Sequence, residues 1–314
     1  MIALNKTILI FEEADPARRT ALQKRYPDFR FIYSDNPDWI KYLPQTNTII
    51  GFIDAAHKDK LKNLTHLELV QLPFAGYESW PEAVSCPLAN ASGIYGLAVS
   101  EYLIGAILNQ YRYFPLLKER QYQKIWDPEL KPIQSISQKT ILVLGCGDLG
   151  STFAKKAKAL GAYTIGAATN VRPIEGFDEV ITLDQLDDYL GKCDILVSTL
   201  PSNEKTRYLL DIDSFRKMKP TAMFINVGRG DLVSLKTLED VMDQKLISSM
   251  VLDVFETEPL PADSSLWQNE QVMITPPISG DFSLPETKEL LWNLVNQNLD
   301  ALQNKTPFVN VVSQ

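Results

Sequence analysis

Short apolar runs alternate with helical patterns along nearly the whole chain. In the N-terminal part, runs rich in β-branched and aromatic residues predict strands at Thr7–Phe11, Phe29–Tyr33, Thr48–Ile53 and Leu67–Leu72, with a weaker one near Pro87–Asn90. Asp15–Tyr26 has the pattern of a helix, with Asp15 as its N-cap and Pro16 in its first turn. The stretch Pro37–Leu43 is a second helical candidate. This alternation predicts βαβ units around a parallel sheet.

A second series of alternating elements follows a long predicted helix, Gly96–Tyr111, and a polar, proline-containing loop, Trp126–Lys139. Strands are expected at Thr140–Leu144, Tyr163–Ala167, Glu179–Thr182, Ile195–Ser198, Met223–Asn226, Ser249–Val254 and Val272–Thr275. Helices are expected at Leu149–Leu160, Asp184–Leu190, Ile212–Lys217, Leu235–Gln244 and Leu284–Leu302, before an apolar tail at Phe308–Val312. The predicted fold class is therefore α/β.

Composition narrows the function classes. The chain has 314 residues, of which 45% are hydrophobic and 22% charged, which is typical of a soluble globular protein with two domains. The net charge is −8 and the largest basic cluster is Lys155, Lys156 and Lys158, so we expect no nucleic-acid partner. No apolar run approaches the roughly 20 residues of a membrane span, so we expect no membrane partner. Three cysteines cannot all pair, which favours a reducing cytoplasm.

The segment Ile141–Gly150 carries the most informative motif. Four apolar residues predict a buried strand, and Gly145, Gly147 and Gly150 then form a G-x-G-x-x-G pattern at the start of a helix. Such glycines permit a tight turn, the approach of the backbone to a pyrophosphate, and close packing of helix on strand. Unpaired N–H groups in the first helical turn, which begins with Asp148 and Leu149, would bind phosphates. This indicates dinucleotide binding; a methyltransferase that binds S-adenosylmethionine is the competing interpretation.

The rest of the dinucleotide fingerprint departs from the NAD pattern. An acidic residue is expected about 20 residues further on, where it would bind the ribose 2′-hydroxyl. The position corresponds to Ala168, and no acid occurs between Asp148 and Glu175. Without that carboxylate a 2′-phosphate is not repelled, and Arg172, together with Thr169 and Asn170, could bind it. The sequence thus favours NADP over NAD; a solvated Arg172 with poor discrimination is the alternative.

The C-terminal part carries further motifs in a recognisable order. They are Leu200–Arg207, Met218–Pro220, Ile225–Gly230, Leu252–Pro261 and Ser265–Trp267, with weaker echoes at Leu72–Tyr77 and Asn90–Gly96. This series closely resembles the D-isomer-specific 2-hydroxyacid dehydrogenase family, which includes phosphoglycerate dehydrogenases and glyoxylate/hydroxypyruvate reductases. The methyltransferase interpretation does not explain these motifs together.

The resemblance implies two Rossmann-like domains with parallel sheets. The substrate domain would be discontinuous, residues 1–96 plus 283–314, and the dinucleotide-binding domain would be residues 97–282. The active site would lie in the cleft between the domains, and a homodimer is implied. The reaction would be hydride transfer between a nicotinamide and a small 2-oxo or 2-hydroxy acid, and no metal is expected.

The resemblance also implies residue roles. Arg229 aligns with the substrate arginine, whose guanidinium would bind the carboxylate and polarise the carbonyl. Glu258 aligns with the acidic catalytic partner, and Asp253 with the acid near the nicotinamide carboxamide. The backbone amides of Ala75 and Gly76 are candidates to bind the substrate carboxylate.

One position breaks the family pattern. The family has Thr-Pro-His where this chain has Thr275-Pro276-Pro277, so proline replaces the general-acid histidine. Proline has neither a titratable group nor a backbone N–H and cannot donate the proton. Three outcomes stay open: reduction with Glu258 or a water as donor, a new donor such as Asp281 or Tyr77, or a catalytically inactive NAD(P)-binding sensor or partner subunit. The two histidines, His57 and His66, are expected to have surface roles.

Overall fold

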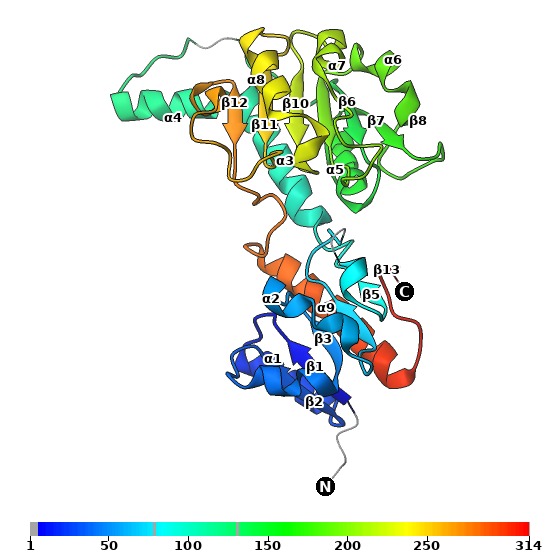
Figure 1. Ribbon diagram of the computed structural model, residues 1–314. Coiled ribbons are helices and arrows are strands. Elements are labelled where there is room, and N and C mark those ends of the chain that lie inside the picture. The colour runs from blue at the N-terminus through cyan, green and yellow to red at the C-terminus, as the bar shows by residue number, and fades with distance from the viewer. Residues whose placement is uncertain (1–5, 78–79, 130–131, 314) are drawn as a thin grey trace. The chain divides into compact units, whose positions relative to one another are not determined.

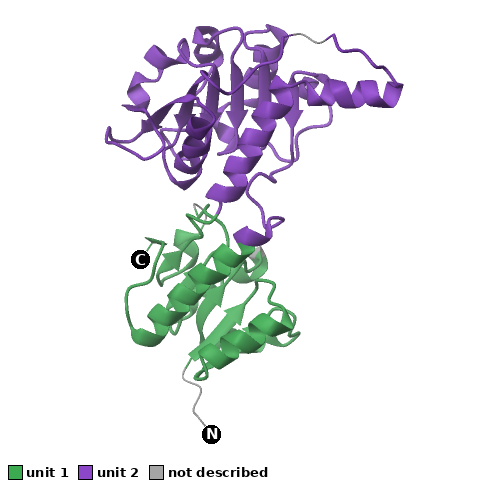
Figure 2. Cartoon of the chain, turned by 180° about the vertical axis from the view of Figure 1, so that it is seen from behind, with its two compact units in different colours: residues 1–94, 288–314 green, residues 95–287 purple. Residues whose placement is uncertain are grey.

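The computed structural model describes residues 6–77, 80–129 and 132–313, and the chain divides into two compact units. Unit 1 comprises residues 1–94 and 288–314, and unit 2 comprises residues 95–287. Figure 2 shows the two units in green and purple. Each is an α/β unit with its own sheet.

Unit 2 contains a parallel seven-stranded sheet in the order β12-β11-β10-β9-β6-β7-β8 (Figure 1). Its strands are β6 (Thr140–Leu144), β7 (Tyr163–Ala168), β8 (Glu179–Thr182), β9 (Ile195–Ser198), β10 (Met223–Asn226), β11 (Ser249–Leu252) and β12 (Val272–Ile274). The chain runs outward from β6 to β8 and then returns to β9 on the other side of β6. This reversal is the topological switch point, where ligands bind beyond the carboxyl ends of the strands in such sheets.

Helices complete the βαβ units of unit 2. They are α3 (Gly96–Tyr111), α4 (Phe114–Gln123), α5 (Asp148–Ala159), α6 (Asp187–Leu190), α7 (Ile212–Lys217) and α8 (Leu235–Asp243). Helix α3 packs along α5. The central strands are mostly apolar, and all their residues except Thr140 are buried, as expected of a parallel sheet covered on both faces. This core holds the loops at the strand ends in place.

Unit 1 contains a six-stranded sheet in the order β13-β5-β4-β3-β1-β2. Its strands are β1 (Lys6–Ile10), β2 (Phe29–Tyr33), β3 (Thr46–Ile50), β4 (Leu69–Gln71), β5 (Leu88–Ala89) and β13 (Val311–Ser313). Its helices are α1 (Pro16–Arg25), α2 (Ala55–Lys58) and α9 (Pro285–Asn304), of which the residues from Lys288 onward belong to this unit. β13 alone among the described strands is antiparallel to its neighbour.

The structure confirms the α/β class and differs from the sequence predictions in local details. Pro37–Leu43 corresponds to a 3-10 helix, Trp39–Gln45, because Pro44 inside it lacks the N–H of a regular α-helical ladder. Helix α4 was not predicted, since none of its residues is buried and the helix therefore lacks the buried stripe of a core helix. No helix in the described parts of the chain is long and apolar enough to cross a membrane.

Candidate functional site

The glycine motif forms a tight turn between β6 and α5 that only glycine fits at two positions. Gly145 has φ +98°, in the left-handed region that favours glycine. A Cβ on Gly150 would lie 1.9 Å from the carbonyl oxygen of Gly145, whereas a Cβ on Gly147 would meet nothing within 4 Å. Gly145 and Gly150 are therefore structural requirements of the turn, and Gly147 leaves open space at its surface.

Thr199, one residue beyond β9, closes the other side of this turn. Its hydroxyl lies 3.2 Å from the carbonyl oxygen of Leu144 and 3.0 Å from that of Gly145. The turn thus lies at the β6–β9 switch point. This contact fixes the backbone that would bind a pyrophosphate.

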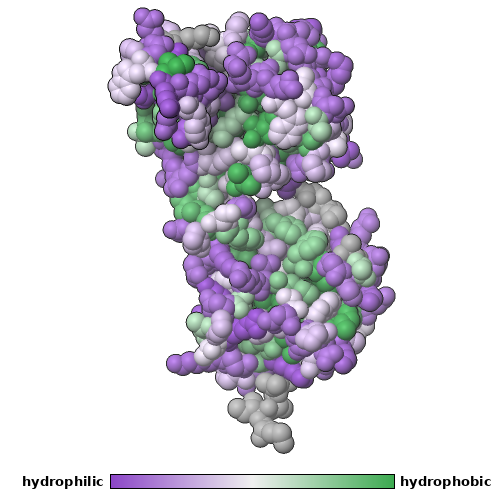
Figure 3. All heavy atoms as spheres, turned by 90° about the vertical axis from the view of Figure 1, so that its left-hand side faces the viewer, coloured by the Kyte–Doolittle hydropathy of each residue, from purple (hydrophilic) through white to green (hydrophobic). Residues whose placement is uncertain are grey.

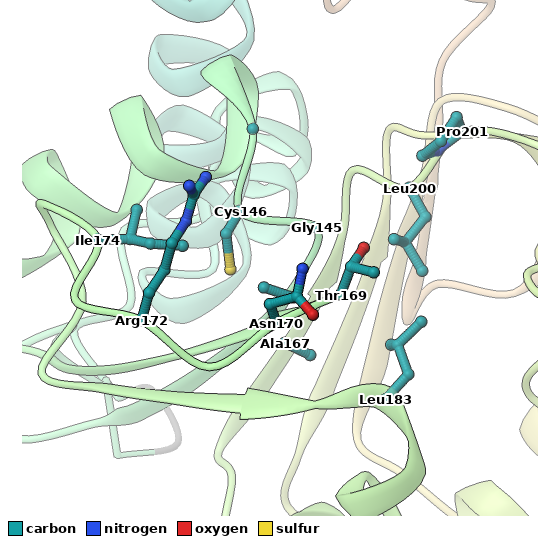
Figure 4. A pocket seen from close by; sticks show the side chains of 12 residues that line it. Gly145, Cys146, Ala167, Thr169, Asn170, Arg172, Ile174, Leu183, Leu200 and Pro201 are labelled. Carbon is teal, nitrogen blue, oxygen red and sulfur yellow. The ribbon is translucent and has the colours of Figure 1, made fainter.

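A pocket of about 560 Å³ opens beside the glycine turn (Figure 4). Its lining comes from the carboxyl ends of β6, β7 and β9 and from the adjoining loops: Gly145, Cys146, Gly147, Ala167, Ala168, Thr169, Asn170, Arg172, Ile174, Leu183, Leu200 and Pro201. The apolar side chains of Ile174, Leu183 and Leu200 offer surfaces for a flat ring. Burial raises the pKa of Cys146 to about 11, so its side chain lines the pocket as a thiol. The pocket suits the adenosine part of a dinucleotide.

The pocket contains a cation and no carboxylate. Ala168 ends β7 where the NAD fingerprint has an acid, and the side chains of Thr169 and Arg172 follow it in an exposed loop. In Figure 4, the Arg172 side chain extends beside Cys146, with Thr169 and Asn170 between it and Leu200. The described residues give Arg172 no ion-pair partner. Its charge therefore stays available to an anion.

Two predicted cofactor residues, Asp148 and Leu149, do not line this pocket. The Asp148 carboxylate instead approaches the start of α3, where a Cβ on Gly96 would lie 2.7 Å from its Oδ1. Burial raises the pKa of Asp148, and a hydrogen bond from the backbone of Gly96 opposes that shift. Any contact of these two residues with a phosphate would therefore use their backbone amides.

Arg229 follows β10, and a buried asparagine fixes its backbone. The Asn226 side chain donates to the carbonyl oxygen of Arg229 at 2.9 Å and accepts from the N–H of Gly228 at 3.1 Å. A Cβ on Gly230 would lie 1.9 Å from the carbonyl carbon of Phe255, so the Arg229 loop packs directly on the backbone that follows β11. The half-buried guanidinium also donates to the carbonyl oxygen of Gly228. Sequence reasoning missed Asn226, although it lies within the Ile225–Gly230 motif.

Asp253, immediately after β11, is buried and holds the loop that follows β12. Its Oδ1 accepts from the Thr275 hydroxyl at 2.6 Å and the N–H of Ile278 at 3.1 Å, and its Oδ2 accepts from the N–H of Ser279 at 3.0 Å. The Tyr102 hydroxyl of α3 lies 2.7 Å from Thr275 Oγ1. Because the Thr275 proton goes to Asp253, Tyr102 must be the donor to Thr275. Burial raises the pKa of Tyr102 to about 12, which keeps the phenol protonated.

Glu258 lies on the loop after β11 and Pro277 on the loop after β12, and the Asp253 carboxylate connects these two loops. The exposed Glu258 side chain folds back so that its Oε1 accepts from the N–H of Phe255 at 2.9 Å. Pro277 is exposed and lies between residues whose groups bind Asp253. Arg229, Asp253, Glu258 and Pro277 thus belong to one cluster at the carboxyl edge of the unit 2 sheet.

Ala75 and Gly76 lie in unit 1, in the loop after β4. The Asn90 side chain donates to the carbonyl oxygen of Ala75 at 2.7 Å, and the N–H of Ala91 donates to that of Phe74 at 3.0 Å. Among the hydrogen bonds within the described residues, none uses the N–H of Ala75 or Gly76. Their amides are therefore available at the carboxyl edge of the unit 1 sheet.

The two histidines of the chain lie in unit 1. His57 Nδ1 lies 2.7 Å from Oδ1 of Asp54 at the start of α2, and His66 is exposed. Within the described residues, no group of three His, Cys, Asp or Glu side chains could hold a metal ion. Sequence reasoning also missed Tyr102 and Thr275; the only signal was that Thr275 begins the segment that departs from the family pattern.

The geometry predicts opposite outcomes for two substitutions in the glycine turn. Gly150→Ala should destabilise unit 2 and lower its unfolding midpoint, because the new methyl group overlaps the carbonyl oxygen of Gly145. Gly147→Ala should leave the midpoint nearly unchanged and weaken dinucleotide binding by about tenfold or more, because its methyl group enters the space beside the turn. Urea unfolding and dinucleotide titration measure both. Equal effects of the two substitutions on unfolding would contradict this interpretation.

Comparisons with known proteins agree with this geometry. The family model described as "D-isomer specific 2-hydroxyacid dehydrogenase, NAD binding domain" matches residues 104–279, which lie within unit 2. A protein of Corynebacterium melassecola, named for its position in the proB 3′ region, is 34% identical over 192 residues; the match spans 60% of this chain and 62% of that relative. Glyoxylate/hydroxypyruvate reductase B of Yersinia pestis bv. Antiqua is 28% identical over 300 residues, 92% of this chain and 90% of the relative.

A solved structure extends the similarity over nearly the whole chain. The D-isomer specific 2-hydroxyacid dehydrogenase family protein from Aeromonas salmonicida subsp. salmonicida has a TM-score of 0.87 and 30% sequence identity, and the alignment covers 98% of this chain and 99% of that one. The family model alone matches more than half of the present sequence. The chain therefore belongs to the D-isomer-specific 2-hydroxyacid dehydrogenase family.

Proposed function

We propose that this protein is an NAD(P)-dependent oxidoreductase that transfers hydride between a nicotinamide and a small 2-oxo or 2-hydroxy acid. The observation that carries the proposal is the position of Arg229, which Asn226 and the Gly230–Phe255 contact fix at the same sheet edge as the glycine turn. A dinucleotide that lies on the turn and crosses the switch point reaches the ends of β10 and β11.

Each site residue has a role in this proposal. The Arg229 guanidinium binds the substrate carboxylate and polarises its carbonyl group, since its planar fork matches two oxygen atoms. The amides of Ala75 and Gly76 are further donors to that carboxylate. Asp253 both holds the loop after β12 and, with its remaining lone pair, accepts from the nicotinamide carboxamide. Glu258 is the acidic group beside the reacting atoms.

Arg229 provides the test of this function. NADPH oxidation with glyoxylate and hydroxypyruvate should be measurable in the unmodified protein, and Arg229→Gln should lower kcat/KM by about a hundredfold or more through loss of a preorganised cation. Arg229→Lys should recover only part of the loss, because an ammonium group cannot form the two-pronged contact. Arg216→Gln, on the exposed face of α7, is the matched control.

The same assay separates the enzyme from the alternative of an inactive sensor or partner subunit. An unmodified protein that binds NADPH but oxidises it with no acid substrate would support the sensor. Turnover that is lost in Arg229→Gln while NADPH binding persists would support the enzyme.

We further propose that the cofactor is NADP(H). The support is local: Ala168 replaces the acid that would repel a 2′-phosphate, and Arg172 in the pocket lining has no ion-pair partner within the described residues. Thr169 and Asn170 supply additional polar groups on the same loop. These groups suit a dianionic phosphate better than a ribose hydroxyl.

Arg172→Gln should therefore weaken NADPH binding by about 10- to 100-fold, the effect of losing one hydrogen bond to a charged group. NADH binding should change little, because NADH lacks the phosphate. Dissociation constants for both cofactors, measured by fluorescence titration, check this expectation. Tighter binding of NADH than NADPH by the unmodified protein would contradict it.

We also propose that two copies associate through the segment around α4. This segment presents an apolar surface, here called the arm surface: Phe114, Leu116, Leu117, Tyr122, Ile125 and Trp126. The Trp126 side chain is 99% exposed, and α4 has no buried residue. Helix α4 projects from unit 2 in Figure 1, and Figure 3 views that side, where green apolar residues lie among hydrophilic ones. Such a surface is typical of a contact that a symmetric homodimer covers.

We also propose that the protein is located in a reducing cytoplasm, since Cys86, Cys146 and Cys193 are all unpaired.

The arm surface predicts a measurable dependence of assembly on Trp126. Sedimentation should give a dimer, and the double substitution Leu117→Ser with Trp126→Ser should shift it toward the monomer, because both side chains lose buried apolar area. Trp267→Ser, a 52% exposed tryptophan outside the arm surface, is the control and should leave the dimer intact. A monomeric unmodified protein would contradict the proposal.

A further inference from the structure

In the loop 275–279, which contains proline at the position of the family's general acid, the backbone N–H groups and the Thr275 hydroxyl are already used. Pro276 and Pro277 have no N–H, and the N–H groups of Thr275, Ile278 and Ser279 are all hydrogen-bonded within the fold. The Thr275 hydroxyl also donates to Asp253. The polar hydrogens of these groups point into buried acceptors, so none of these groups can protonate a substrate oxygen.

Among the described acidic residues on the loops around Arg229, all but Glu258 accept more than one hydrogen bond or ion pair. Asp231 accepts from Ser202 and Arg207, and Glu256 accepts from Tyr208 and the N–H of Leu235. Glu258 accepts one backbone N–H through Oε1, and the described residues provide no ion-pair partner for it. The family arrangement would pair this carboxylate with a histidine, which this chain lacks at position 277. Within the described residues, the cluster therefore has a carboxylate with one backbone hydrogen bond in place of an acid–base pair.

A site with a free carboxylate and no proton donor disfavours reduction of a C=O bond and favours reduction of a protonated C=N bond. Hydride addition to a ketone produces an alkoxide, which needs a proton as it forms. Hydride addition to a protonated imine produces a neutral amine, which needs none. A cationic C=N–H group also donates to a carboxylate, whereas a ketone oxygen only accepts.

We propose that the preferred substrate class of this site is the protonated imine of a 2-oxo acid, which the protein reduces to a 2-amino acid; this inference rests on the proposed hydride-transfer function. The hydride leaves the nicotinamide of NADPH with its electron pair and forms a C–H bond at the imine carbon. The π electrons of the C=N bond become the lone pair on nitrogen. The products are NADP⁺ and the neutral amine, so charge and electrons balance without a proton donor.

Arg229 and Glu258 bind different parts of such a substrate. The Arg229 guanidinium binds the carboxylate, as it would for a 2-oxo acid. The free Oε2 of Glu258 accepts the N–H of the iminium and lies on the loop whose Phe255 backbone packs against Gly230. A negative group at this point stabilises the cation in the ground state and holds the nitrogen in one orientation.

The first test compares substrates on one enzyme preparation. NADPH oxidation is measured with pyruvate, with pyruvate plus excess methylamine, and with a preformed six-membered cyclic imine bearing a 2-carboxylate. We expect kcat/KM for the cyclic imine to exceed that for pyruvate by about 10²- to 10⁴-fold, the usual contribution of a positioned acid. The imine rate should fall as the pH rises above the pKa of the imine itself, since only its protonated form reacts.

The outcomes separate this inference from the function on which it rests. A kcat/KM for pyruvate or glyoxylate equal to or above that for the imine overturns the inference and leaves the oxidoreductase function standing. Binding of NADPH with turnover of neither class overturns both. Rapid reduction of the imine supports both.

Two variants provide an independent check. Pro277→His should reduce the imine-to-pyruvate ratio of kcat/KM by about 10²- to 10⁴-fold, because it adds an acid that only the ketone needs. The loop should keep its conformation, since Thr275, Ile278 and Ser279 hold it through Asp253; an unaltered NADPH dissociation constant verifies this. An unchanged ratio in a folded variant would overturn the inference.

Glu258→Gln tests the acceptor. It should lower kcat/KM for the imine by about 10- to 100-fold, because the carboxylate that binds the iminium N–H is lost. Glu270→Gln, exposed before the start of β12, is the matched control and should not change it. Full imine activity in Glu258→Gln would contradict the role of this carboxylate.

Discussion

The parallel alignment of the strands in unit 2 is the constraint on which the site depends. Every βα unit returns the chain to the same end of the sheet, so all strands finish at one edge. The glycine turn, Arg229, Asp253 and Pro277 come from four separate strand ends, and no helix is needed to bring them together. The topology of the sheet alone therefore brings these four loops to the same edge.

At the carboxyl edge of the unit 2 sheet, close backbone contacts and buried polar groups fix the conformations of the loops. Gly230 allows the Arg229 loop to pack on the backbone of Phe255, and Asn226 satisfies two backbone groups of the same loop. Asp253 extends this order to the loop after β12, and Tyr102 connects α3 to it through Thr275. Buried polar groups with complete hydrogen bonding are typical of sites that need one conformation.

The sequence predicted the elements of this fold well where a short-range pattern controls them. The central strands are recognisable because they are buried and mostly apolar, and Gly145 and Gly150 are recognisable because a tight turn requires them. Helix α4 escaped prediction because no apolar face of it is buried within the chain. A pattern of buried positions cannot reveal a helix whose side chains all stay partly exposed.

The site was predictable in its residue types and less so in their connections. Asp253 was expected to contact a cofactor, and it also holds Thr275, Ile278 and Ser279, which are distant in sequence. Tyr102 lies on helix α3 outside the motifs, so its hydrogen bond with Thr275 has no sequence signature. Contacts of this kind arise from tertiary packing.

The way in which Asp253 binds the loop after β12 has an evolutionary consequence. Residues 275, 278 and 279 hold the loop backbone through their hydrogen bonds to Asp253, and the exposed side chain at position 277 takes no part in these bonds. Mutations can therefore exchange the group at this position without passing through unfolded intermediates. Related chains that keep these loop contacts are therefore free to differ in the chemical group that they present at this single position.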